Sequence, residues 1–291
     1  MKNWRKVLAA LAIGAAVVAA APAQVTFSDL RKREHPAPTM VVRYGADSLQ
    51  VADVWLPRGP GPFPTVLMIH GGCWQTDVAD RHLMDWIALD LQRRGIAVWN
   101  IDYRGADRPG GGYPGTYLDV AAAADSMVEH APELHLDMKR TIAVGHSAGG
   151  HLALWLAGRQ RIARSSPLSN PRPLPLAGVV SLAGLPDLER ETQIDNGCGR
   201  MISATMGAGH YAETSVPRLA PLGVRQFLVN GLADAIVPAD LASDYRRRMR
   251  KAGDKVTIDW VPDAGHFDLI APETPAWKVA VRAIESALPP K

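Results

Sequence analysis

The sequence has few cysteines, no metal-binding motif, no internal repeat and no apolar run long enough to cross a membrane. Its 291 residues include 2 cysteines, and no His-Glu-x-x-His pair or cysteine–histidine cluster has the spacing of metal ligands. The unbroken apolar run at residues 7–20 has 14 members, whereas a bilayer-spanning helix needs about 20. We therefore expect no metal site and no stable membrane anchor.

The first 23 residues have the organisation of a secretory signal peptide. Three basic residues precede the apolar run, and Ala21-Pro22-Ala23 supplies an A-x-A cleavage site before Gln24. We expect residues 1–23 to be removed and the mature protein to be periplasmic or secreted. Those three basic residues account for the formal net charge of +3, so charge gives no reason to expect nucleic acid as a partner.

The two cysteines, Cys73 and Cys198, both follow the predicted cleavage site. An even number of cysteines in an oxidising compartment favours a disulfide between them. The alternative is two separate buried thiols that act as small apolar residues.

Strand-like and helix-like segments alternate along most of the chain. Strands are predicted at 40–44, 49–55, 65–69, 96–101, 141–144, 176–182, 226–229 and 256–261, and helices at 79–94, 116–130, 152–157, 238–251 and 274–287. Continuous apolar strands that alternate with helices are typical of a parallel sheet covered on both faces. The sequence predicts an α/β fold with a mostly parallel sheet of about eight strands.

We expect one domain over residues 40–291, preceded by a polar, proline-containing lead-in at 24–39 that runs over the surface. Residues 185–222 show no clean period. This segment is predicted to form a small irregular cap or wall over the functional site.

Residues 140–158 are the most informative stretch of the chain. An apolar run leads into Gly145-His146-Ser147-Ala148-Gly149 and then into a helical segment. G-x-S-x-G between a strand and a helix is the pattern of a nucleophile elbow, where a strained turn presents a serine and needs neighbours without a Cβ. Ser147 is therefore the candidate nucleophile.

A serine nucleophile needs a base, and the base needs an acid that fixes its tautomer. His266 follows the last predicted strand and Asp234 follows the preceding one, which gives the order Ser, Asp, His. A turn role for Asp234, with Asp187 as the acid instead, and a structural role for His266 are the alternatives. His146 and His151 are expected to be structural neighbours of the serine.

Acyl transfer also needs N–H donors for the oxyanion. His70-Gly71-Gly72-Cys73 follows the first central strand, and its glycines allow the backbone to turn toward Ser147. Together with Ala148, the residues Gly71, Gly72 and Cys73 are the candidate oxyanion donors. A simple strand-ending turn is the alternative.

The segment Gly110-Gly111-Gly112-Tyr113-Pro114-Gly115 matches the glycine pattern of dinucleotide-binding loops. It is separated from the preceding strand, however, and Pro114 removes an N–H from any phosphate cradle. We expect no dinucleotide and no other cofactor.

Five motifs together resemble the α/β-hydrolase superfamily, in its esterase/lipase branch with an HGG oxyanion loop. They are His70 to Trp74, Asp102 to Arg104, Gly145 to His151, Asp234 with Val237-Pro238, and Gly265 to Phe267. The set is similar to arylformamidase-like (kynurenine formamidase-like) and carboxylesterase-like hydrolases over residues 40–288. The resemblance implies Ser147 as nucleophile, His266 as base and then acid, and Asp234 as the residue that orients His266.

These observations predict an exported serine hydrolase that cleaves small carboxylic esters or N-formyl and aryl amides through an acyl-enzyme. A prolyl-oligopeptidase-like serine peptidase and a non-catalytic binding protein on a hydrolase scaffold are the alternatives.

The candidates for an apolar substrate pocket are Trp74, Tyr113, Trp155 and Met201, with a place in the core as the alternative. A Cys73–Cys198 bond would tether the oxyanion loop to the 185–222 segment. The sequence gives no oligomeric state.

Overall fold

A computed structural model describes residues 23–193, 197–204 and 206–290 of the chain. Apart from Ala23, the predicted signal peptide lies outside the described residues, so it stays a prediction. Within the described part, none of the helices combines the length and the apolar character that crossing a bilayer requires.

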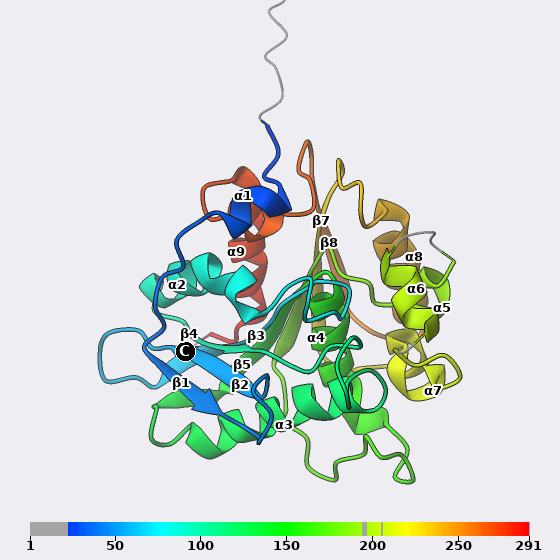
Figure 1. Cartoon of the computed structure of the whole chain (residues 1–291), viewed down its shortest axis with the longest axis horizontal. Coiled ribbons are helices and arrows are strands. Elements are labelled where there is room, and N and C mark those ends of the chain that lie inside the picture. The colour runs from blue at the N-terminus through cyan, green and yellow to red at the C-terminus, as the bar shows by residue number, and fades with distance from the viewer. Residues whose placement is uncertain (1–22, 194–196, 205, 291) are drawn as a thin grey trace, which may run out of the picture.

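The described residues form one sheet with the strand order β1-β2-β4-β3-β5-β6-β7-β8 (Figure 1). Its strands are β1 (Met40–Arg43), β2 (Val51–Trp55), β3 (Phe63–Ile69), β4 (Ala97–Ile101), β5 (Leu136–His146), β6 (Gly178–Leu182), β7 (Arg225–Gly231) and β8 (Val256–Val261). β2 pairs antiparallel with both β1 and β4, and every other pair is parallel. The predicted α/β architecture with about eight mostly parallel strands is confirmed.

Helices cover both faces of the sheet. The main ones are α1 (Phe27–Arg31), α2 (Asp85–Arg93), α3 (Gly115–His130), α4 (Ala148–Gly158), α8 (Ala239–Lys251) and α9 (Pro275–Ala287). Buried residues of α1, α2 and α9 pack on one face, and those of α3, α4 and α8 pack on the other (Figure 1). Along β3, Val66 and Met68 join the first layer and Leu67 and Ile69 the second, because successive side chains of a strand point to opposite faces.

Most elements begin or end within a few residues of the predicted bounds, and two starts illustrate how the structure departs from the sequence prediction. The predicted helix 79–94 begins as a 3-10 turn, η1 (Arg81–Met84), because the Asp80 side chain accepts the His82 N–H and starts a tighter turn ahead of α2. β5 begins at Leu136, before its apolar run. Its polar start pairs with the start of β3 across a register shift between Pro64 and Thr65.

The 24–39 segment forms part of the folded domain. Its short helix α1 begins with a capping box between Thr26 and Asp29, and Leu30 is fully buried. The Val25 N–H donates to Asp268 at 2.8 Å, and the Phe27 ring stacks on Phe267 at 5.5 Å. The lead-in therefore packs against the loop that follows β8.

The 185–222 segment consists of short helices, which explains why its sequence shows no clean period. They are α5 (Leu188–Glu191), α6 (Gly197–Ala204), α7 (Tyr211–Thr214) and the 3-10 turn η3 (Val216–Arg218). They lie on the side of the sheet that carries α8 (Figure 1). Buried side chains of this segment, among them Leu185, Leu188, Ile202 and Val216, join the core under α3 and α4.

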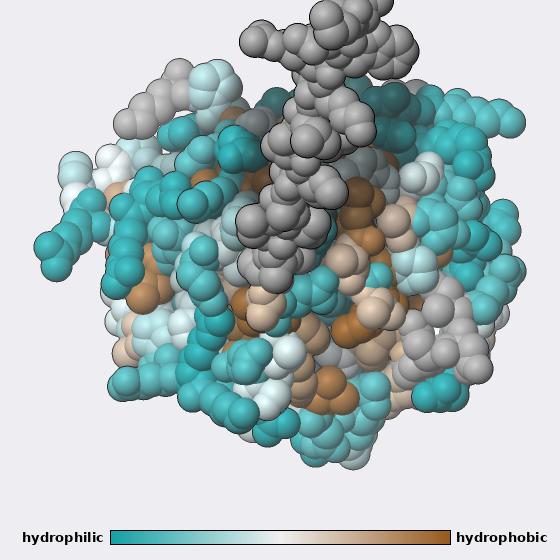
Figure 2. Space-filling model, turned by 90° about the horizontal axis from the view of Figure 1, so that it is seen from above, coloured by the Kyte–Doolittle hydropathy of each residue, from teal (hydrophilic) through white to brown (hydrophobic). Residues whose placement is uncertain are grey.

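The carboxyl ends of the parallel strands carry the predicted site residues. The loops after β7 and β8 run side by side, since the Leu232 N–H donates to Val261 O at 2.9 Å and the Ala233 N–H to Ala264 O at 3.1 Å. From above, the molecule shows mostly hydrophilic side chains at its rim and hydrophobic ones toward the middle (Figure 2). Open α/β sheets bind their ligands at this edge.

Candidate active site

Ser147 lies in a strained turn between β5 and α4. Its φ of 54° and ψ of −123° are rare for a residue with a side chain. The Ser147 N–H donates to Leu182 O of the neighbouring β6 at 2.8 Å. The sheet therefore holds the serine in the conformation that a nucleophile elbow requires.

The glycines around Ser147 allow backbones to pass too closely for any side chain. A Cβ on Gly145 would lie 2.0 Å from Gly149 O, and a Cβ on Gly149 would lie 2.2 Å from Ile69 O. Backbone oxygens cannot rotate out of the way, so only glycine fits at these positions.

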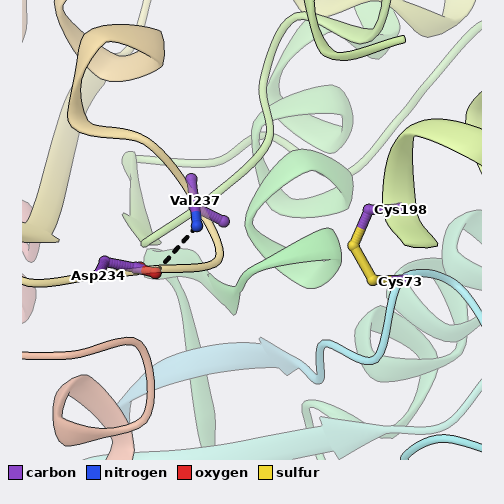
Figure 3. Close-up of a disulfide and its surroundings, with 4 residues drawn as sticks. All are labelled: Cys73, Cys198, Asp234 and Val237. Carbon is purple, nitrogen blue, oxygen red and sulfur yellow. Dashed lines mark hydrogen bonds between the residues drawn. A yellow bond between two sulfur atoms is a disulfide. The ribbon is translucent and has the colours of Figure 1, made fainter. Parts of the chain in front are cut away.

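His266 and Asp234 form a buried pair on the two neighbouring loops. His266 Nδ1 lies 2.7 Å from Asp234 Oδ2, and both side chains are almost completely buried. The other carboxylate oxygen, Oδ1, accepts the N–H groups of Ile236 and Val237 at 2.8 and 2.9 Å, and the latter bond is drawn in Figure 3. The two amide bonds to Oδ1 hold the Asp234 carboxylate so that Oδ2 faces His266.

The surroundings of Asp234 favour its charged form. Burial acts to raise the pKa of Asp234, but the hydrogen bond and charge of His266 and the amide donors of Val237 and Ile236 outweigh it, so the pKa is lowered. An ionised Asp234 accepts a hydrogen bond from the Nδ1–H of His266, and this tautomer leaves Nε2 with the free lone pair of the ring.

Asp187, the alternative acid, serves a different partner. It caps α5, accepts the Ser215 hydroxyl at 3.1 Å and forms an ion pair with Arg248. Its contacts fasten the 185–222 segment to α8, and His266 Nδ1 is bonded to Asp234 instead.

The loop after β3 packs directly against the serine turn. A Cβ on Gly71 would lie 2.9 Å from the Ser147 Cβ. The chain then passes through three successive residues with positive φ, Gly72 (100°), Cys73 (51°) and Trp74 (57°). Ala148, the first residue of α4, has no acceptor for its N–H within the helix. These features support the predicted oxyanion donors.

A buried polar network holds the start of this loop. His70 Nε2 lies 3.0 Å from Asp102 Oδ1, and the Tyr103 hydroxyl donates to His70 O at 3.1 Å while its ring stacks on the imidazole at 4.3 Å. Arg81 Nη1 lies 3.2 Å from the other Asp102 oxygen. The sequence motif around Asp102 therefore has a structural role, which is to fix His70.

A disulfide joins Cys73 to Cys198 on α6, with 4.7 Å between the Cα atoms (Figure 3). This is the pairing that the cysteine count favours. The bond ties the loop after β3, where Cys73 has a positive φ, to Cys198 in the 185–222 segment, 125 residues further along the chain.

The two histidines next to the serine are buried and form backbone contacts. The neutral His146 ring donates from Nε2 to His266 O at 3.1 Å, and His151 Nε2 contacts Thr214 O of α7 at 2.8 Å. Burial lowers the pKa of His146 to about 3 and that of His151 to about 4. His146 thereby supports the loop that carries His266, a contact that the sequence pattern could not reveal.

The candidate pocket residues lie at different depths. Trp74 and Trp155 are fully buried and belong to the aromatic core with Tyr117, so in this structure they present no surface to a ligand. Tyr113 is partly buried, with its hydroxyl on Glu213 and its ring on His210. Met201 is partly buried on α6.

Ser147 and His266 are both nearly buried, with exposed fractions of 3% and 6%. Within the described residues, one group of side chains has ligand atoms close enough to hold a metal ion: His35, His82 and Asp85. None of its members belongs to the Ser147, Asp234 and His266 set.

Comparison with known proteins gives matches to esterases. A family model described as BD-FAE matches residues 52–249. A probable isoprenylcysteine alpha-carbonyl methylesterase of Arabidopsis thaliana is 23% identical over 78% of this chain and 50% of its own length. Carboxylesterase NlhH of Mycobacterium tuberculosis is 32% identical over 43% of this chain and 38% of its own length. The chain spans half or less of the length of these curated relatives.

Solved structures of similar fold include a truncated carbohydrate esterase from gut microbiota, at 21% identity and a TM-score of 0.70 over 87% of this chain and 99% of that one. Thermogutta terrifontis esterase 2 phosphonylated by sarin has 21% identity and a TM-score of 0.71 over 89% of this chain and 99% of that one. These likenesses establish the α/β-hydrolase fold.

We predict that stability falls as the pH drops from 6.5 toward 4. Because His146 and His151 have lowered pKa values in the folded protein, the unfolded chain binds protons in this window that the folded one does not. Each pKa unit corresponds to about 1.4 kcal/mol. Urea unfolding at pH 7.5, 6 and 5 should show a falling free energy of unfolding in the wild type. The fall should be smaller in His151→Gln, and it should equal that of the wild type in the control His135→Gln, which changes an exposed histidine. Equal slopes in all three proteins would contradict this assignment.

The disulfide should stabilise the fold substantially. In the chain-entropy account, closing a loop of this size contributes about 4–5 kcal/mol. Replacing both Cys73 and Cys198 with Ser should lower the free energy of unfolding by about 4–5 kcal/mol. Added reductant should destabilise the wild type but leave the stability of the double variant unchanged. Two reactive thiols in the denatured, unreduced wild type would rule the bond out.

Proposed function

Because the chain belongs to the BD-FAE family, within the esterase and lipase branch of the α/β-hydrolases, we propose that it is a serine carboxylesterase that works through an acyl-enzyme. The observation that carries the proposal is the buried His266–Asp234 pair, 2.7 Å apart, on loops at the same sheet edge as the strained turn of Ser147. Both curated relatives carry esterase names, which favours an ester as the substrate.

In the first half of the proposed reaction, Ser147 Oγ attacks the ester carbonyl and His266 Nε2 takes up its proton. Asp234 holds the His266 ring by its Nδ1 proton and stabilises the imidazolium that forms. Because burial excludes water from the pair, this interaction is stronger than it would be in solution.

Backbone N–H groups would stabilise the negative oxygen of the tetrahedral intermediate. Ala148 offers its N–H at the positive end of α4, and Gly72 and Cys73 offer theirs from the loop packed on Ser147. The loop is fixed in advance by the Cys73–Cys198 bond and by the contacts of His70, so no donor has to be reorganised during the reaction.

Collapse of this intermediate breaks the ester bond, and His266 gives its proton to the departing alcohol. A water molecule then attacks the acyl-enzyme with His266 as base, which releases the carboxylic acid and restores the Ser147 hydroxyl. The same steps would cleave N-formyl or aryl amides, but the named relatives are esterases and nothing in the site favours an amide.

The near-complete burial of Ser147 favours small esters as substrates. Export from the cytoplasm is part of the proposal. It is supported by the signal-like sequence of residues 1–23 and by the Cys73–Cys198 disulfide, a bond that persists in oxidising compartments.

Replacing Ser147 with Ala should lower kcat/KM for short p-nitrophenyl esters by about three orders of magnitude or more, because the nucleophile is lost. Ser165→Ala, at an exposed serine outside the site, is the matched control and should keep wild-type activity. Activity of Ser147→Ala within tenfold of the wild type would overturn the mechanism.

A panel of esters with graded acyl chains, together with N-formylkynurenine, would identify the preferred substrate class. Faster turnover of the formamide than of every ester would replace the ester assignment.

A further inference from the structure

Two histidines and a carboxylate converge where the N-terminal segment crosses α2. His35 Nδ1 lies 3.2 Å and His82 Nδ1 lies 2.9 Å from the same oxygen, Asp85 Oδ2. The three ligand atoms all lie within 4.8 Å of one another. They come from the lead-in, from η1 and from the first residue of α2.

The arrangement has the dimensions of a tetrahedral metal site. Zinc binds imidazole nitrogens and carboxylate oxygens at about 2.0–2.2 Å, which places neighbouring ligand atoms about 3.3 Å apart. The nitrogen-to-oxygen distances of His35 and His82 to Asp85 are therefore close to what a shared ion needs, and small side-chain rotations would admit it.

The surroundings also suit a cation. Asp85 is 1% exposed, so its charge is held away from water between the two half-exposed histidines. A second buried carboxylate, Asp53, has Oδ2 at 3.8 Å from His82 Nδ1 and is paired with Arg81. Next to the group lies a cavity of about 300 Å³, lined by His35 and His82 as well as Asp77 and Asp80, which leaves space for a water molecule as fourth ligand.

We propose that His35, His82 and Asp85 form a binding site for a divalent transition metal, with Zn²⁺ as the ion that this ligand set suits best. Two imidazoles and one carboxylate are typical zinc ligands. When the ion binds, the Nδ1 lone pair of each neutral ring coordinates it. The proton that Nδ1 holds in the metal-free protein passes to water, and Nε2 takes up a proton from water, so each ring stays neutral.

The ion would fasten the N-terminal segment to the sheet. His35 belongs to the segment that packs on the catalytic histidine loop through Val25 on Asp268 and Phe27 on Phe267. Phe267 follows His266 directly, and its ring lies 5.1 Å from the His266 ring. The site would therefore stabilise the support of His266 without touching the reacting atoms.

The proposed site departs from the expectation of no metal, because the two histidines are 47 positions apart and no motif links them. The fold brings them together where the stretch after α1 packs on α2. There the Trp86 indole donates to Glu34 O at 3.0 Å, and its ring lies 4.8 Å from the His35 ring.

The test uses the untagged protein after dialysis against a chelator. Equilibrium dialysis with Zn²⁺ alone should give one ion bound per chain, with a raised Tm. His35→Ala and His82→Ala should each weaken binding by at least about 100-fold, since loss of a ligand exceeds the 10–100-fold cost of losing a ligand's partner. His135→Ala, at an exposed histidine outside the group, should bind as the wild type does.

A second readout tests the fastening role. Zn²⁺ should slow tryptic cleavage at Arg31, Lys32 and Arg33 in the wild type but not in His82→Ala. No bound zinc in the wild type, or equal binding by the wild type and the His35 and His82 variants, would overturn the proposal. Circular dichroism of both variants establishes that they are folded, so a loss of binding reports the ligands.

Discussion

The close approach of three backbone segments around Ser147 is the constraint on which the site depends. Gly145, Gly149 and Gly71 each lie where a Cβ would meet backbone or the serine itself at 2.0 to 2.9 Å. The three glycines let the loop after β3 pack on the turn in which Ser147 has its positive φ. A side chain at any of the three positions would move the proposed oxyanion donors away from Ser147.

The remaining contacts keep those segments in place from different sides. The Cys73–Cys198 bond and the His70–Asp102 pair hold the loop after β3, and Asp234 holds His266, the proposed base. The N-terminal segment supports the same histidine through its contact with Phe267. An ion at the proposed metal site would fix the N-terminal segment further, without contacting the reacting atoms.

The sheet is predictable from the sequence because apolar runs mark buried parallel strands, and the candidate site residues are found in the same way. Ser147, Asp234 and His266 each lie within about five residues of the end of such a run. Contacts between distant segments leave no such pattern: the contact of His146 with His266 O and the convergence of His35 on Asp85 depend on the fold. The burial of Trp74 and Trp155 likewise depends on it, because both join one buried cluster with Tyr117 of α3.

The most direct test of the central claim is covalent labelling of the folded protein with a fluorophosphonate, followed by mass spectrometry of its peptides. A nucleophile activated by a histidine and presented to oxyanion donors reacts with such a reagent, whereas an ordinary serine does not. We expect one adduct per chain, on Ser147, and none after denaturation. The absence of an adduct on folded protein, or an adduct on another residue, would contradict the assignment of Ser147 as the nucleophile.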